Sequence, residues 1–548
     1  MRARYLSLGL MVTLAIWALA GPAAVARDLL DLVPPDAGAA AMLDFSPDSD
    51  SVRLLASMPD PHPKAGELFR QSFEKMLRGV GVNINLREDV MGALGSRGVI
   101  VVRMTPGARM PDILVLAEVK DAARVERTLR RTLGAFLRTY TLDRAERPGA
   151  VVHSWKRPSG DTLLSYGIVD GSVLVASSSS SMTDKVLATP ASPDASPLRE
   201  ALRSAPEGIF RYAALPSMLG APKEVPEGTI VGSTAFKQEG LVSELVVTSS
   251  DPRAQQILQM AGGLPPVTGD AMKPIVDGSL AAVALGNPGA IVEQIQKVAG
   301  DAGPLAGLKA LLPSLMGLLG NDAAVALRTA VPSPSWVISI AAKDAATLKD
   351  QWAAVQTLVG SVGILTFKEG RLGDHPVQFL QTPNAKEAGP MVLAAVDRYL
   401  VIAADQRTLE ESIGAIEGQE VSLADTDAFK AARAVAGGDA RLVGYIDPSI
   451  LVGAGMAFFQ AAWMASPMGE QMAEGLSDLR SISFSVSVDG KGLRLRKLVG
   501  MSNPRALPSV MAGMGMAAMM GAGIAMPMIA QRQILSRPVP SATETQPA

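Results

Sequence analysis

The chain has 548 residues, with 51 Lys and Arg against 53 Asp and Glu, and it contains no cysteine. Without cysteine there can be no disulfide, no thiol nucleophile, no Cys-ligated metal cluster and no lipid-modified N-terminal cysteine. The net charge of −2 gives no electrostatic footprint for nucleic acid. With 48% hydrophobic and 19% charged residues, the chain is also too apolar for wholesale disorder.

Residues 1–26 have the pattern of a secretory signal peptide. Arg2 and Arg4 precede the apolar segment Leu6–Ala20, and Ala24–Ala26 has the small-x-small pattern of a cleavage site. The alternative is an uncleaved N-terminal anchor, because the apolar run approaches the length of a membrane span. Both interpretations predict that the chain is exported from the cytoplasm.

The segment after residue 26 alternates strand and helix patterns without a βαβ rhythm. Asp121 can cap a helix over 122–140, and Asp170-Gly171 suits the turn of a hairpin. Hairpins beside helices indicate an α+β fold with largely antiparallel sheet. Further strands are expected over 39–45, 99–103, 113–119, 163–169, 172–176, 230–237 and 241–248, and further helices over 64–78, 182–188 and 197–204.

The same succession of patterns occurs twice. The segment 91–95 recurs as 316–320, 120–123 as 343–346, 173–176 as 400–403, and 216–219 as 448–451, always in the same order. We therefore predict two tandem homologous α+β units, over 27–260 and 270–503, the second with an added helix near 454–464. The alternative is a spurious alignment of Ala-, Val- and Gly-rich strings.

The C-terminal segment 507–530 is a second apolar block without a charged residue. Its length can span a bilayer, and Arg532 and Arg537 beyond it would place the polar tail 531–548 in the cytoplasm. The block is rich in Met, Ala and Gly, so its insertion is marginal compared with a Leu-rich span. We expect a transmembrane helix that anchors the exported body to the inner membrane.

Small residues recur on one side of this predicted helix. Gly513, Ala517 and Gly521 have the four-residue spacing that allows two membrane helices to approach closely, and Ile524 and Ile529 are strongly apolar. These five residues are the predicted anchor and helix-packing positions. Two alternatives are a soluble helix or tail that packs on the body, and a Cu(I) cluster of Met514, Met516, Met526 and Met528.

Several short motifs together resemble an exported bacterial family known only as a domain of unknown function. They are Val33-Pro34-Pro35-Asp36, Gly92-x-x-Gly95, Lys120-Asp121, Val169-Asp170-Gly171 and the stretch 423–429. The resemblance extends from Asp28 to about Gly500. It implies an envelope location, often with a membrane tether, and it supplies no activity or catalytic residue.

No constellation of catalytic, cofactor-binding or metal-binding residues is evident. The three histidines, His62, His153 and His375, have no metal-ligand spacing, and each is expected to be a surface or packing residue. Asp374 and His375 would suit an orienting acid and a base, but no Gly-x-Ser-x-Gly elbow supplies a nucleophile. We expect no cofactor and no enzymatic activity.

Other polar clusters have simpler interpretations. The serines 177–181 suit a hairpin exit and a helix cap, and the acidic residues 419–427 suit a helix entry. Asp44, Asp48 and Asp50 resemble a calcium loop only loosely. The arginines 124, 127, 130 and 131 form a solvated helix face, with contact to anionic lipid as the alternative.

The sequence therefore predicts a cell-envelope protein with a binding or scaffolding role, tethered to the membrane by its C-terminus. The predicted partners are the membrane itself, a second copy through the small-residue face, and an unknown protein or lipid. The first alternative is a periplasmic carrier of an apolar ligand such as lipid, because Met-rich surfaces adapt to apolar ligands. The second alternative is a hydrolase that uses residues without a recognisable motif.

Overall fold

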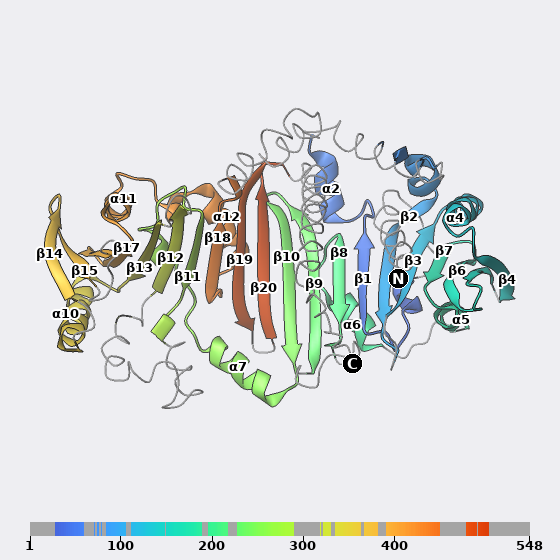
Figure 1. The fold of residues 1–548 in the computed structure, drawn as a ribbon, viewed down its shortest axis with the longest axis horizontal. Coiled ribbons are helices and arrows are strands. Elements are labelled where there is room, and N and C mark those ends of the chain that lie inside the picture. Colours follow the sequence, from blue (N-terminus) through green and yellow to red (C-terminus); the bar gives the residue numbers. More distant parts are fainter. Residues whose placement is uncertain are drawn as a thin grey trace, which may run out of the picture.

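Figure 1 shows the computed structural model of the chain, which describes most of residues 28–503. The described ranges are 28–59, 84–105, 111–147, 149–188, 196–216, 227–289, 322–329, 335–362, 366–381, 391–449, 478–489 and 492–503, with residues 71, 74, 75, 78 and 318. The predicted signal peptide, the C-terminal block and the helix near 454–464 lie outside these ranges, as does most of the helix over 64–78.

Ten strands of the N-terminal part pair side by side in one antiparallel series. Their spatial order is β4-β5-β6-β7-β3-β2-β1-β8-β9-β10. The bounds are β1 Ala39–Asp44, β2 Leu94–Arg103, β3 Asp112–Val119, β4 Thr141–Arg147, β5 Ala150–Lys156, β6 Thr162–Val169, β7 Val173–Ser177, β8 Phe210–Ala214, β9 Gly228–Lys237 and β10 Gly240–Ser249. We call these strands the first series.

The next ten strands repeat this order as a second series. It runs β14-β15-β16-β17-β13-β12-β11-β18-β19-β20, again with only antiparallel pairs. The bounds are β11 Ala281–Leu285, β12 Asp322–Thr329, β13 Ser335–Ala341, β14 Thr366–Leu372, β15 His375–Gln381, β16 Met391–Val396, β17 Tyr399–Ala403, β18 Leu442–Ile446, β19 Leu479–Asp489 and β20 Gly492–Met501. The expected α+β class with antiparallel sheet is confirmed.

The two series meet edge to edge, so that all twenty strands form one sheet. The junction is the antiparallel pair β10–β20, in which Glu244 stands opposite Arg496. Counted from the start of each strand, Glu244 and Arg496 occupy the same position, so the local two-fold relation passes between them. Glu244 accepts from Arg496 Nε at 3.4 Å and lies 3.1 Å from Arg494 Nε. In a junction between two identical units, the same residue would stand on both strands at this point. Here the two residues carry opposite charges and attract each other.

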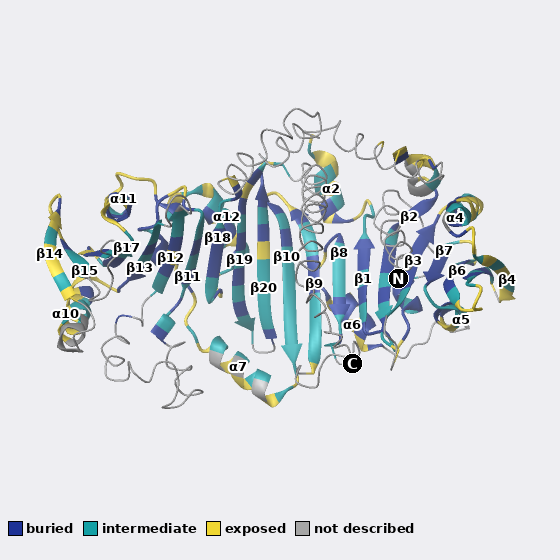
Figure 2. Ribbon diagram, in the orientation of Figure 1, coloured by how far each residue is buried: buried dark blue, intermediate teal, exposed yellow. Residues whose placement is uncertain are grey.

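Helices cover the sheet on both faces. On one face, α4 (Ala122–Phe136) packs on the first series and α10 (Ala345–Val362) on the second. On the other face lie α5 (Ser180–Ala188), α6 (Pro197–Ser204), α11 (Gln406–Glu417) and α12 (Asp427–Ala436). Buried residues alternate along the strands, with Leu116 of β3 in one core and Ala117 in the other. Figure 2 shows dark, buried strands beneath these helices and half-buried strands at the central junction.

Local sequence rules explain several of these elements. Asp121 caps α4 by accepting from Arg124 N at 2.9 Å, and the helix ends earlier than expected, before β4 begins at Thr141. Asp170 and Gly171 both have positive φ, as the hairpin turn between β6 and β7 requires. The strand β4 was not predicted from the sequence, because both faces of this edge strand are largely exposed and polar. The helices α2 (Asp50–Ser57) and α7 (Pro252–Gly262) were likewise not expected.

A buried carboxylate stabilises an irregularity between β2 and β3. The register of this pair shifts between Leu94 and Gly98, which leaves backbone N–H groups without a strand partner. Glu118, fully buried, accepts from the backbone N–H groups of Ser96 and Arg97, each at 3.1 Å. Arg97 Nε donates to its other oxygen at 2.5 Å. Gly95 is required beside it, because a Cβ there would lie 2.3 Å from the Glu118 Cβ.

Candidate functional site

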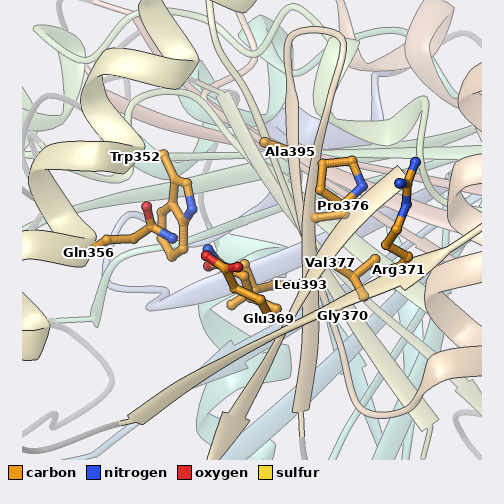
Figure 3. A pocket seen from close by; sticks show the side chains of 11 residues that line it. Trp352, Gln356, Glu369, Gly370, Arg371, Pro376, Val377, Leu393 and Ala395 are labelled. Carbon is orange, nitrogen blue, oxygen red and sulfur yellow. The ribbon is translucent and has the colours of Figure 1, made fainter. Parts of the chain in front are cut away.

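A pocket of about 530 Å³ lies between helix α10 and the edge strands β14, β15 and β16 of the second series. Trp352 and Gln356 line it from the helix, and Leu393 and Ala395 line it from β16 (Figure 3). The volume falls within the range of pockets that hold small organic ligands, roughly 300–1,000 Å³. The feature is therefore large enough for a small-molecule site.

Strand register determines how polar and apolar groups alternate in the pocket. Glu369 of β14 pairs with Gln378 of β15, which in turn pairs with Leu393 of β16. Side chains of directly paired antiparallel residues point to the same face, with Cβ atoms about 4.5–5.5 Å apart. One row across three strands therefore presents a carboxylate, a carboxamide and an aliphatic side chain towards α10. A second row pairs Arg371 with Pro376.

Two acceptors in the first row have no partner of their own. Gln378 Oε1 is buried, and no residue that the structure describes donates a hydrogen bond to it. Within the same described part of the chain, the exposed carboxylate of Glu369 forms no hydrogen bond or ion pair. Figure 3 shows Glu369 on the side of Trp352 and Gln356, with Arg371 and Pro376 on the other side of the pocket. Glu369 thus lies on the side of the indole ring, and Gln378 is its neighbour on the adjacent strand.

The indole of Trp352 is held in place by its neighbours. Phe367 of β14 contacts it edge to face, with ring centroids 6.0 Å apart and an interplanar angle of 90°. Both aromatic residues border the apolar core beneath α10, which includes Leu348 and Leu400. A packed indole beside unpaired acceptors offers a rigid aromatic surface and a negative potential to a ligand.

The corresponding place in the first series is filled with side chains. Counting along the matching strand pairs puts Arg144, His153 and Tyr166 at the positions of Glu369, Gln378 and Leu393. His153 stacks on Tyr166, with ring centroids 5.1 Å apart, and both side chains are buried. Aromatic rings therefore occupy in the first series the volume that is open in the second.

The helix side also differs, with one larger and one more polar side chain in the second series. Asp121 and Asp344 cap α4 and α10, and counting from these caps puts Leu129 at the position of Trp352 and Leu133 at that of Gln356. Leu133 is buried in the first core, whereas Gln356 lines the pocket. Ile168 likewise corresponds to Ala395. A leucine, an isoleucine and a tyrosine are thus replaced by a glutamine, an alanine and a leucine.

His153 is the buried titratable group of the filled site. Its Nε2 lies 3.3 Å from Glu126 Oε1, while its Nδ1 has no hydrogen-bond partner in the described residues. Burial lowers the pKa of His153, and the charges of Arg130 and Arg144 lower it further against the opposing effect of Glu126. The ring is therefore neutral in the folded protein at neutral pH. Burial also raises the pKa of the Tyr166 hydroxyl.

The structure separates the residues that sequence analysis paired as an acid and a base. His375 Nε2 lies 2.8 Å from Glu417 Oε1 at the end of α11, and Asp374 stays in the β14–β15 turn. Ser177–Ser181 lie where expected, at the exit of β7, where Ser178 Oγ accepts from Ile113 N at 2.9 Å. His62 lies outside the described residues. Asp374, His375 and the serines do not line the pocket.

The other polar clusters take part in local contacts. Asp44 accepts from Ser46 N at 3.0 Å, and Asp50 begins α2, so they close a turn and start a helix. Asp425 pairs with Lys273 at 2.7 Å, and Arg131 of the arginine face pairs with Asp89 at 2.9 Å. Within the described ranges, no group of three His, Cys, Asp or Glu side chains is arranged to hold a metal ion.

The predicted membrane anchor lies outside the described residues, together with Gly513, Ala517, Gly521, Ile524 and Ile529. Among the helices that are described, none is both long enough and apolar enough to cross a membrane. The anchor and its helix-packing positions therefore stay predictions.

The pocket was not predicted, although its residues have a pattern that the repeat could have revealed. Trp352 and Gln356 are one helical turn apart, and Glu369 and Arg371 are two residues apart, on the same face of β14. Only alignment of the two halves shows that Gln356 replaces a buried leucine. The fold and this pocket define an α+β protein with a single large sheet and a ligand-sized pocket in its second half.

Comparisons with known proteins agree with the expected family for part of the chain. Residues 333–516 match a family described as a protein of unknown function, DUF3352. The match includes the pocket, whereas the wider coverage expected from the motifs stays a prediction. No curated protein matches the chain.

Among solved structures, the chain is similar to one titled "Structure of crystal form I of TP0453". The two share 8% identity, and the alignment covers 43% of this chain and 84% of that chain with a TM-score of 0.25. At that TM-score the similarity supports no statement about function.

Proposed function

We propose that this chain is an exported cell-envelope protein that binds a small, partly apolar molecule in the pocket beneath α10. The observation that carries the proposal is the difference between the two series. The same place is closed by His153 and Tyr166 in one and open in the other, where unpaired acceptors line it. A place that buried side chains fill in one half and that lies open in the other is available to a ligand.

The role proposed is binding rather than catalysis. Apart from the indole, the polar side chains of the pocket among the described residues are two glutamines, a glutamate and an arginine, without a serine, threonine, cysteine, lysine or histidine. His375, the candidate base, faces Glu417 instead. These side chains suit recognition of a ligand that is apolar on one side and polar on the other.

The envelope location and the tether complete the proposal. They rest on the signal-peptide pattern of residues 1–26 and on the uncharged block 507–530. The small-residue face of that block, Gly513 to Gly521, would bring two copies together in the membrane. Fractionation of the full chain with a C-terminal tag tests the tether, and complete release by osmotic shock would contradict it.

We also propose that the two series descend from one duplicated unit, which explains how a ligand site arose on one side only. The support is the identical strand order and the two Asp-capped helices at equivalent places. Profiles of homologous sequences for 27–260 and for 270–503 should match each other. Similarity no greater than chance would contradict a common origin.

Extraction of the purified full-length protein tests ligand binding directly. Organic extracts analysed by mass spectrometry should contain a small molecule in stoichiometric amount. The double variant L393Y/A395I, which approximates the filled site of the first series, should yield an empty protein. An empty wild-type protein, or an equal amount of ligand from the variant, would contradict the assignment of this pocket.

A further inference from the structure

We infer that the ligand of the α10 pocket carries an ammonium group, which is bound by Glu369, Gln378 and Trp352, and an aliphatic part, which lies over Leu393 and Ala395. This inference rests on the proposed function and specifies its ligand. The structure brings the three polar partners together through the row Glu369–Gln378 and the facing helix.

The first step of the argument is the unpaired carboxylate. Glu369 lines the pocket and forms no ion pair with a residue that the structure describes, since Arg371 lies on the other side of the pocket. At the same position the first series has Arg144, so the charge at this place changes sign between the two halves. A cationic ligand group is the complement that the second series lacks.

The second step is the buried acceptor. Gln378 Oε1 has no donor in the described part of the protein, and leaving a buried acceptor unpaired is unfavourable. An ammonium group carries several N–H donors, so it can bind Glu369 and Gln378 at the same time. An ionised carboxylate or phosphate group has no such donor, and its negative charge would be repelled by Glu369.

The third step is the aromatic wall. Trp352 is fixed by its edge-to-face contact with Phe367, and indole faces attract cations within about 6 Å. Its counterpart in the first series is Leu129, which has no such preference. Carboxylate, carboxamide oxygen and indole therefore suit a cation on the α10 side of the pocket, while Arg371 lines the opposite side.

The fourth step is the apolar floor. Leu393 is 2% exposed and continues the core beneath α10, and Ala395 replaces an isoleucine. The pocket that these residues help to line has a volume of about 530 Å³, which leaves room for a short aliphatic chain. The predicted ligand is therefore an amphiphile with one amine head.

Calorimetric titration of the full chain with three probes of equal chain length tests this inference. Octylamine is protonated at neutral pH, octanol is neutral and octanoate is anionic. We expect octylamine to bind about tenfold more tightly than octanol, and octanoate most weakly. The variant Glu369→Gln should lower octylamine affinity about fivefold and leave octanol within about twofold.

A matched control and a folding check separate the possible outcomes. Glu146→Gln removes an exposed carboxylate from β4, at the far edge of the sheet, and should leave all three affinities unchanged. L393Y/A395I should abolish binding of every probe while circular dichroism and the unfolding midpoint show a folded protein. If that variant unfolds, Ala395→Ile alone should weaken all three probes.

The proposed function and the ammonium inference fail in different ways. If no octyl compound binds and the extracts are empty, the pocket is not a ligand site. If octanol or octanoate binds as tightly as octylamine, or if the preference survives Glu369→Gln, the pocket binds a ligand but the ammonium assignment is wrong. Displacement of octylamine by phosphatidylethanolamine vesicles identifies a lipid amine, and binding without displacement identifies a free amphiphile.

Discussion

Replacement of Glu118 by alanine is the perturbation whose effect the structure defines most fully. The carboxylate is fully buried between β2 and β3 and accepts from the N–H groups of Ser96 and Arg97 and from Arg97 Nε. Alanine removes every acceptor at once. Because Ser96 is itself buried, water cannot easily replace the lost partner.

The expected magnitude follows from what remains after the substitution. An unpaired buried N–H destabilises by about 1–3 kcal/mol, and removal of one partner of a buried charge pair by about 3–5 kcal/mol. Arg97 is about one-third exposed, so water compensates part of its loss. We therefore expect Glu118→Ala to lower the free energy of unfolding by about 3–4 kcal/mol. Glu118→Gln keeps an acceptor for the backbone and should lower it by about 1–2 kcal/mol.

Urea unfolding followed by circular dichroism measures these differences as shifts of the first transition midpoint at constant slope. Asp184→Ala is the control, since it removes a half-exposed partner 3.0 Å from Arg147 and should change stability by no more than about 1 kcal/mol. If Glu118→Ala destabilises no more than Asp184→Ala, or if the alanine and glutamine variants are equal, the carboxylate does not stabilise the register shift.

Three further predictions concern the cores and the junction. Burial lowers the pKa of His153, so only the unfolded chain binds a proton there when the pH drops below about 6.5, and the stability of the wild type should fall. His153→Gln should remove this acid sensitivity. Unfolding midpoints at about pH 7.5 and about pH 5 test this. Gly444→Ala would place a Cβ 2.2 Å from the ring of Phe484. This clash should lower the melting temperature by an amount equivalent to about 1–3 kcal/mol. An unchanged melting temperature would show that the ring moves freely. Glu244→Arg should destabilise the junction by about 1 kcal/mol, and adding Arg496→Glu should restore stability; no recovery in the double variant would contradict a paired charge.

The sequence could predict the elements whose cause is local. Asp121 precedes an amphipathic helix and caps it, and Asp170-Gly171 has the backbone freedom that a tight hairpin requires. Both interactions act over a few residues, so they can be predicted from residue type and spacing. Edge strands such as β4 have no apolar face, and therefore they leave no comparable pattern.

The candidate site could not be predicted because its parts are distant in sequence. Gln378 stands beside Glu369 and Leu393 only when three strands pair in one register, and Trp352 reaches them only when α10 packs on that face. A shift of one residue would turn each side chain to the opposite face. Sequence analysis gave a ligand carrier as an alternative, from composition alone, and it could not say where the ligand would bind.

By itself, the sequence determined the α+β class, the antiparallel hairpins and the double succession of patterns, because periodicity, caps and turns depend on near neighbours. It also carries the export and anchor patterns as predictions. Only the tertiary structure decided that the two series share one sheet through β10 and β20 and that a pocket opens beneath α10, at the place where the first series has the buried His153 and Tyr166. The physical reason is that strand pairing and the volume left between side chains depend on residues far apart in the chain.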